Sequence, residues 1–177
     1  MDETDDYNNV QIKKEIEARR AFLFTLEWLL ALLNRYSSSI QFDLVHIELG
    51  SDHELGEAFG VQEAFKQLAL LTTSLTNDFR KTDLIARHVT DYWIIVPYDS
   101  NREQIQTKIV DIFNATKHKD LNIINREISI FSLPLAKTDA ITNLTSAIEF
   151  LEYLKTNKKE LASKKFTLSA NNEFINA

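Results

Sequence analysis

An arginine and an aspartate three positions apart, Arg80 and Asp83, could together contact a small ligand. A planar guanidinium can fork onto phosphate or base oxygens, and a carboxylate can accept paired N–H donors. Arg87, four residues after Asp83, would supply a second cation. The alternative is a surface ion pair between Arg80 and Asp83 worth under about 1 kcal/mol, with Asp83 capping the segment that follows.

Other common catalytic or metal-binding patterns are absent from the sequence. The four histidines, His46, His53, His88 and His118, show no metal-ligand spacing, and structural or solvated roles are expected for them. There is no Ser-His-Asp grouping, phosphate-loop lysine motif or glycine-rich cradle. The chain contains no cysteine, so disulfides and thiolate chemistry are excluded. The sequence therefore predicts no metal site, no catalytic residues of these classes and no cofactor.

Composition predicts one domain in a reducing compartment, by default the cytoplasm. The 177 residues are 44% apolar, enough for a single core, and residues 10–177 are expected to form it. Residues 1–9 are acidic and are expected to be a disordered tail. The net charge of −6 argues against nucleic acid as a partner. The longest apolar stretch, Ala21 to Leu33, is too short to cross a membrane.

Apolar periodicity predicts helices alternating with strands, plus one hairpin. Such an order indicates an α/β or α+β fold of palm-like type, with a central mixed, largely antiparallel sheet and helices on both faces. The expected elements are helix Ile12–Tyr36, strand Phe42–Leu49, helix Glu57–Phe79, hairpin strands Leu84–Arg87 and Tyr92–Val96, helix Arg102–Thr116, strand Asn122–Ser132, helix Asp139–Lys159 and an edge strand Lys164–Ser169.

The first helix has one wide apolar stripe that includes Phe22, Leu26 and Leu33. Such a stripe usually packs on the core, and docking against a partner helix is the alternative. Trp28 and Trp93 are expected to be core or interface anchors.

Several segments in one register resemble the GGDEF domain of diguanylate cyclases, from about Ala18 to Lys155. Ala18-Arg19-Arg20-Ala21-Phe22 is similar to the family's Asn-Arg-Arg-x-Phe, and Phe59-Gly60 to its Tyr-Gly. Residues 80–87 match Arg-x-x-Asp-x-x-Ala-Arg without a gap. The signature hairpin follows as Val89-Thr90-Asp91-Tyr92-Trp93. Ile128-Ser129-Ile130 and Leu154-Lys155 are looser matches.

The resemblance implies the palm-like cyclase fold, but the signature is altered at the positions that contact phosphate and metal. Val89 and Thr90 replace two glycines, and a β-branched residue is strained in a left-handed turn. Tyr92 replaces the signature glutamate, and a phenol is a poor magnesium ligand. Glu48 occupies a plausible ligand position on the first strand, and Asp91 is expected on the opposite face from the metal.

Further positions implied by the family have lost charge or hydrogen-bonding capacity. Gly50 stands at a second aspartate position, His53 at the phosphate lysine, and Gly56 and Phe65 at the guanine-contacting asparagine and aspartate. Each lost stabiliser typically costs 10²–10³ in rate. The resemblance therefore implies a degenerate, inactive cyclase and not an enzyme.

Arg80 and Asp83 match the family's inhibitory site, where cyclic di-GMP binds away from the catalytic centre. The first hypothesis is a bacterial signalling receptor that binds cyclic di-GMP through Arg80, Asp83 and Arg87 and relays it to a protein partner or a homodimer. The second is a ligand-independent scaffold that binds partners through helix Ile12–Tyr36 or through an exposed patch of Val89, Tyr92 and Trp93. The third, an active enzyme, would require cyclic di-GMP synthesis from GTP and magnesium.

Overall fold

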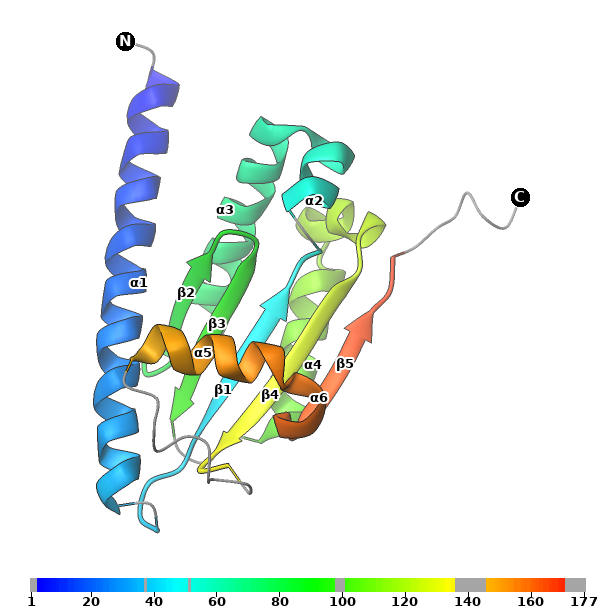
Figure 1. Cartoon of the computed structure of the whole chain (residues 1–177). Coiled ribbons are helices and arrows are strands. Elements are labelled where there is room, and N and C mark those ends of the chain that lie inside the picture. Colours follow the sequence, from blue (N-terminus) through cyan, green and yellow to red (C-terminus); the bar gives the residue numbers. More distant parts are fainter. Residues whose placement is uncertain (1–2, 37, 51, 98–100, 136–145, 171–177) are drawn as a thin grey trace.

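The computed structural model describes residues 3–36, 38–50, 52–97, 101–135 and 146–170 (Figure 1). Helices and strands alternate along the chain as the sequence predicts. The elements are α1 (Glu3–Tyr36), β1 (Phe42–Glu48), α2 (Asp52–Phe59), α3 (Val61–Asp78), β2 (Leu84–His88), β3 (Asp91–Pro97), α4 (Arg102–Asn114), the 3₁₀ segment η1 (Thr116–Ile123), β4 (Arg126–Leu133), α5 (Ala147–Thr156), α6 (Lys158–Leu161) and β5 (Lys164–Leu168).

The five strands form one sheet in the order β2-β3-β1-β4-β5. All four neighbouring pairs are antiparallel, so the expectation of a mixed sheet is wrong, whereas its largely antiparallel character is confirmed. β1 lies between β3 and β4 at the centre of the sheet, and its side chains are nearly all buried because helices cover both faces. The predicted edge strand near the C-terminal end of the described chain is β5, which pairs with β4.

The two faces of the sheet have separate hydrophobic cores, because successive side chains of a strand point to opposite sides. One core packs β1, β3 and β4 against α2, α3, α4 and η1 and includes Val45, Ile47 and Tyr92. The other packs the same strands against α1 and α5 and includes Leu44 and Trp93. In Figure 1, α5 crosses one face of the sheet and α3 and α4 lie on the other. This confirms helices on both faces.

Helix α1 begins at Glu3, so a disordered tail over residues 1–9 is the wrong expectation for its described part. The acidic side chains of Glu3, Asp5 and Asp6 lie in the first turn, where the helix dipole favours negative charge. Farther along, Phe22 and Leu26 are buried and Leu33 is partly buried against the α1–α5 core. The predicted core stripe is confirmed, while Trp28 is exposed and takes no part in it.

Several other element boundaries also differ from the sequence prediction. Gly60, with φ 77°, separates α2 from α3 where one helix was expected. Residues 116–123 form η1, so β4 begins at Arg126 and not near Asn122. The expected start of a helix at Asp139 lies outside the described residues, and α5 begins at Ala147, after Ser146 caps it by accepting the Glu149 N–H at 3.2 Å. Across the described ranges, no helix is long and apolar enough to span a bilayer.

Candidate functional site

Val89 and Thr90, the first two residues of the signature hairpin, form the turn between β2 and β3, and this turn is strained. Val89 has φ 56°, and it is the one non-glycine residue with positive φ among the described residues. A β-branched side chain in this region crowds its own backbone. The turn is also tied to the centre of the sheet, because Leu49 donates its N–H to the Thr90 carbonyl at 3.4 Å. The hairpin therefore has a β-branched residue at a left-handed position that glycine would adopt at little cost.

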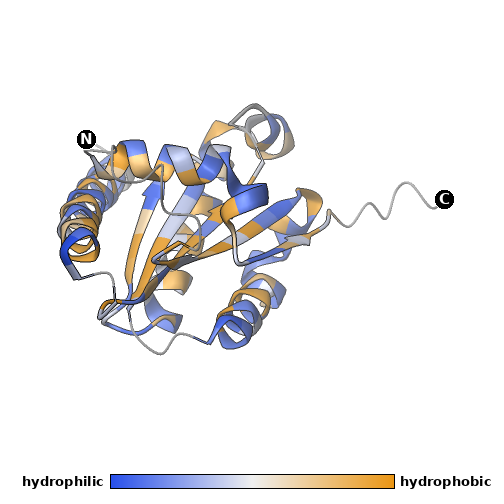
Figure 2. Ribbon diagram, turned by 60° about the horizontal axis from the view of Figure 1, so that its bottom comes forward, coloured by the Kyte–Doolittle hydropathy of each residue, from blue (hydrophilic) through white to orange (hydrophobic). Residues whose placement is uncertain are grey.

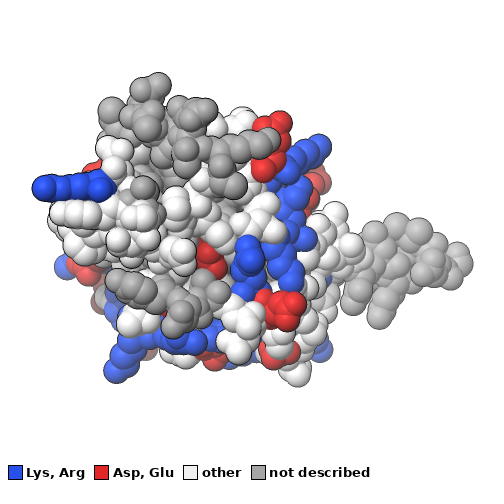
Figure 3. Space-filling model, turned by 90° about the horizontal axis from the view of Figure 1, so that it is seen from below, with Lys and Arg blue, Asp and Glu red and all other residues white. Residues whose placement is uncertain are grey.

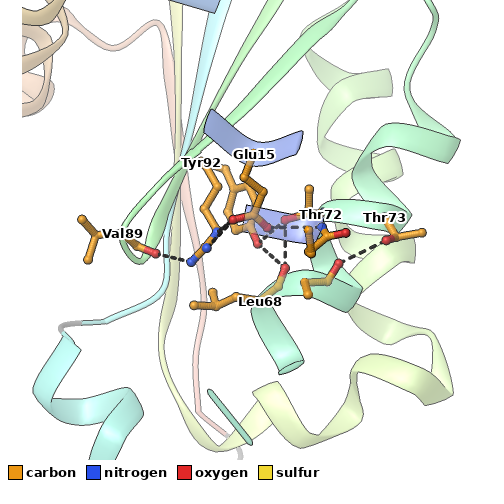
Figure 4. Close-up of polar contacts among 9 residues, drawn as sticks. Glu15, Leu68, Thr72, Thr73, Val89 and Tyr92 are labelled. Atoms are coloured by element: carbon orange, nitrogen blue, oxygen red, sulfur yellow. Dashed lines mark hydrogen bonds and ion pairs between the residues drawn. The ribbon is translucent and has the colours of Figure 1, made fainter. Parts of the chain in front are cut away.

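Tyr92 points into the core beneath α3. Its side chain is fully buried, and its hydroxyl donates to the Leu68 carbonyl at 2.6 Å and lies 3.0 Å from Thr72 Oγ1 (Figure 4). Burial raises the pKa of the phenol above its ordinary value, although the Thr72 hydrogen bond acts in the opposite direction. Tyr92 thus stays neutral and is unavailable as a metal ligand.

The strand register corrects the expected position of Asp91. Glu48 pairs directly with Asp91 across β1 and β3, whereas Tyr92 pairs with Ile47. Directly opposed residues of an antiparallel pair project to the same face, and neighbours in a strand to opposite faces. Asp91 therefore lies on the Glu48 side of the sheet, under α5, and the expectation that it lay on the opposite face was wrong.

Asp91 is buried within a cluster of basic groups. Its carboxylate lies 2.8 Å from His46 Nε2, 3.6 Å from Lys155 Nζ and 3.7 Å from His88 Nδ1. Burial alone would raise the Asp91 pKa, but the His46 hydrogen bond and the nearby positive charge lower it below its ordinary value. The His46 ring also lies against Trp93, with ring centroids 4.3 Å apart. Asp91 is thus a structural ion-pair partner.

The neighbouring carboxylates are bridged by a lysine. Lys158 Nζ lies 3.2 Å from a Glu48 oxygen and 2.8 Å from a Glu127 oxygen. Its hydrogen bond lowers the pKa of Glu127, and although burial alone would lower the Lys158 pKa, the two carboxylates raise it. Within the described residues, no group of three or more His, Asp or Glu side chains is arranged to hold a metal. A divalent cation at Glu48 would have to displace this ammonium group, so the residues do not suit magnesium.

Gly50, Phe65 and His53 stand at positions where the resemblance implies substrate contacts. Gly50 has φ 59°, a conformation that glycine adopts at little cost and residues with side chains rarely adopt, so an aspartate there would be strained. Phe65 is partly buried and faces the Arg87 guanidinium, 5.8 Å from the ring centroid. The side chain of His53 lies outside the described residues.

Arg80 and Asp83 lie in the turn that leads into β2, and the turn holds them close together. The Asp83 carboxylate accepts the Arg80 backbone N–H at 2.9 Å, and Asp83 N–H donates to the Arg80 carbonyl at 2.9 Å. The expected capping role of Asp83 is therefore present. In the described part of the chain the Arg80 guanidinium is exposed and forms no ion pair with Asp83 or any other carboxylate.

Arg87 is held by protein groups. Its Nε donates to Glu15 on α1 at 2.9 Å, its Nη2 donates to the same oxygen, and its Nη1 donates to the Val89 carbonyl at 2.9 Å (Figure 4). Both side chains of the ion pair are largely buried. Arg87 thus connects α1 to the strained turn, and it is not placed beside Arg80 as a second free cation.

Sequence reasoning missed the convergence of His46, His88 and Lys155 on Asp91. His46 on β1 and His88 on β2 are 42 positions apart, and they come together because β1 and β2 both pair with β3. Alternation of side chains within each strand was the available signal, but it does not give the register between strands. His118 is a buried structural histidine, as expected, with Nε2 2.7 Å from Ser74 Oγ.

Comparison with solved structures identifies the fold as that of GGDEF domains. The GGDEF domain of YfiN (TpbB) from Pseudomonas aeruginosa aligns with a TM-score of 0.54 and 17% identity, over 82% of this chain and 92% of that chain. The diguanylate cyclase SiaD from Pseudomonas aeruginosa, crystallised with its activator SiaC, aligns with a TM-score of 0.50 and 10% identity, over 88% of this chain and 66% of that chain. No protein-family model and no curated protein matches the sequence.

The strain at Val89 predicts a stabilising substitution. Val89→Gly is expected to raise the free energy of unfolding by about 1 kcal/mol, because glycine adopts positive φ at little cost and the exposed valine loses little packing. Thr90→Gly is the matched control and is expected to lower it by about 0.5–1 kcal/mol, since Thr90 needs no positive φ. Urea unfolding measures both. Equal destabilisation by the two variants would show that the backbone at Val89 is not strained.

The Asp91 cluster predicts a loss of stability in acid. The folded pKa lies below the unfolded value of about 3.9, so the unfolded chain binds more protons and the stabilisation disappears as pH falls through the folded pKa. Asp91→Asn should cost about 1–3 kcal/mol at neutral pH and flatten the dependence below about pH 4. Exposed Asp111→Asn is the control, with unfolding followed by circular dichroism. An unchanged acid dependence in Asp91→Asn would contradict this assignment.

Proposed function

We propose that this chain is a non-catalytic cyclic di-GMP signalling module that binds its ligand at Arg80 and Asp83 and relays it through protein contacts. The observation that carries the proposal is the exposed Arg80 guanidinium, which has no carboxylate partner among the described residues, beside the Asp83 carboxylate. A guanidinium of this kind can fork onto a phosphate or stack on a guanine. Asp83 uses Oδ2 in the turn, and its other oxygen can accept guanine N–H groups.

Two features support a non-catalytic role. Tyr92 stands at the signature glutamate position, and its hydroxyl is hydrogen-bonded inside the core on the face of the sheet opposite Glu48. Lys158 pairs with Glu48 and Glu127, and Asp91 is hydrogen-bonded to His46 and lies beside Lys155, so these three carboxylates already have partners within the protein. Transition-state charge would be left without the stabilisation that this chemistry requires.

Charge on the protein surface fits a small anionic ligand better than a nucleic acid. The net charge is −6, and basic and acidic side chains are intermixed on the face shown in Figure 3. A nucleic-acid surface would instead carry a broad field of positive charge. A single arginine beside a carboxylate suits a cyclic dinucleotide, which offers both phosphate and guanine groups.

The second candidate function is a ligand-independent interaction scaffold, and one observation favours it. Phe24 and Trp28 on α1 are exposed, which is the pattern of a partner-binding surface. The hairpin patch expected from the sequence is not available, because Tyr92 and Trp93 are buried and only Val89 is exposed. The scaffold function therefore rests on α1.

Calorimetric titration with cyclic di-GMP tests ligand binding. We expect binding by the unmodified protein, weakened about ten- to a hundredfold in Arg80→Ala, because a charged hydrogen bond contributes about 1.5–3 kcal/mol. Lys159→Ala is the control, since Lys159 is an exposed cation on α6, beside the opposite edge of the sheet. Absence of binding by the unmodified protein, or equal weakening in both variants, would reject the proposal.

Incubation with GTP and magnesium tests the non-catalytic role. No cyclic di-GMP should form, because Tyr92 is locked in the core and Lys158 bridges the carboxylates. The product is followed by chromatography alongside an active diguanylate cyclase as positive control. Turnover above the background without protein would show that the chain is an enzyme.

A further inference from the structure

The outer face of α1 carries an apolar patch that the core does not use. Phe24 and Trp28 are 76% and 58% exposed, and Ala21 and Ala31 are exposed beside them. Phe22 and Leu26, on the opposite side of the same helix, are buried against the sheet. In Figure 2, α1 lies at one side of the molecule, and no other described element covers its outer face. A large exposed tryptophan and phenylalanine together are typical of an interface.

The spacing of this patch is that of a helix that pairs with another helix. Ala21, Phe24, Trp28 and Ala31 are separated by three, four and three residues, the alternation of a coiled-coil seam. The same spacing continues backwards through Glu17 and Lys14 to the exposed Val10 and Tyr7. The two charged positions interrupt the seam and restrict how a partner helix can align with it.

We infer that the partner is α1 of a second copy of this chain, packed antiparallel. A twofold axis at the level of residues 22 and 23 places Ala21 against Phe24 of the second copy, small against large. It also places Glu17 beside Trp28 and Lys14 beside Ala31 of the second copy. A twofold contact of this kind is self-complementary, as the commonest homodimers are.

Charges at the border of the patch select this orientation. Arg20 and Glu27 are both exposed, and the antiparallel alignment places Arg20 of each copy beside Glu27 of the other. A parallel alignment would instead put Lys14 against Lys14 and Glu17 against Glu17 in the seam, and like charges there repel. The opposite charges would contribute specificity more than affinity, which would come from Phe24 and Trp28.

This inference goes beyond the proposed function, which leaves the partner open, and it does not require cyclic di-GMP. Arg80 lies in the turn before β2 and outside the α1 patch. Loss of ligand binding in Arg80→Ala should leave self-association unchanged, so the two can fail separately.

Sedimentation equilibrium of the full chain tests the surface. We expect a dimer for the unmodified protein and a dissociation constant raised at least about 30-fold in Phe24→Ser/Trp28→Ser, as loss of interface hot spots predicts. Val61→Ser is the control, because Val61 is equally exposed but lies on α3. Thermal unfolding verifies that each variant folds. A monomeric unmodified protein, or a dimer that survives the double substitution, overturns the inference.

Charge reversal tests the orientation. Arg20→Glu and Glu27→Lys should each weaken the dimer, and the combination should restore it, because each copy then presents both reversed charges to the other. Glu27 also accepts the Ala147 N–H at 3.3 Å, so thermal unfolding of its variants separates loss of folding from loss of association. Failure of the combined variant to regain association overturns the antiparallel alignment.

An inter-label distance provides a second, independent test of orientation. The sequence has no cysteine, so Lys13→Cys can be spin-labelled at one site. Antiparallel helices place the two labels about 19 residues apart along the axis, or roughly 30 Å at 1.5 Å per residue. Parallel helices would place them about 10 Å apart. A measured distance near the shorter value overturns the inference.

Discussion

The alternation of side chains along β1 and β3 is the constraint on which the rest of the site depends. Because Glu48 faces Asp91 and Ile47 faces Tyr92, each signature residue on β3 is assigned to one side of the sheet. Tyr92 fills the α3 side and is hydrogen-bonded there, whereas Asp91 and Trp93 lie on the α5 side. A slip of one residue would bury Asp91 among Ile47 and Leu68. The alternation of apolar residues therefore determines the fold and also the side of the sheet on which each signature side chain of β3 lies.

On the α5 side, the protein supplies its own cations to the carboxylates that the strand ends bring together. Lys158 bridges Glu48 and Glu127, and Asp91 is shared among His46, His88 and Lys155. Buried or half-buried carboxylates at one end of a sheet would repel each other without such partners. The lysines come from α5 and α6. The packing of these two helices on the sheet therefore also brings the positive charges that pair with the carboxylates at the strand ends. A cation-binding function and this packing compete for the same oxygens.

The fold was predictable from the sequence because it depends on patterns that extend over many residues. Apolar periodicity located α1, β1, α4 and β5, and the match over residues 80–93 placed the hairpin correctly. Features that depend on one or a few residues were not predicted. Gly60 divides α2 from α3, and the acidic residues that were expected to form a tail instead extend α1. In the site, the side of the sheet on which Asp91 lies and the commitment of Arg87 to Glu15 depend on tertiary register, which local sequence does not encode.

Helix α1 connects the β2–β3 hairpin, on its inner side, to the apolar patch on its outer side. Glu15, on its inner side, holds Arg87, which in turn binds the carbonyl of strained Val89, while Phe24 and Trp28 project from its outer side. The ion pair between Glu15 and Arg87 is largely buried, so a rotation of α1 that repositions the outer patch would break it and leave two charges unpaired, which is costly. A partner on the outer face must therefore bind α1 in its present orientation, or else it would break the ion pair between Glu15 and Arg87. Binding at the outer face of α1 and the conformation of the β2–β3 turn are therefore coupled.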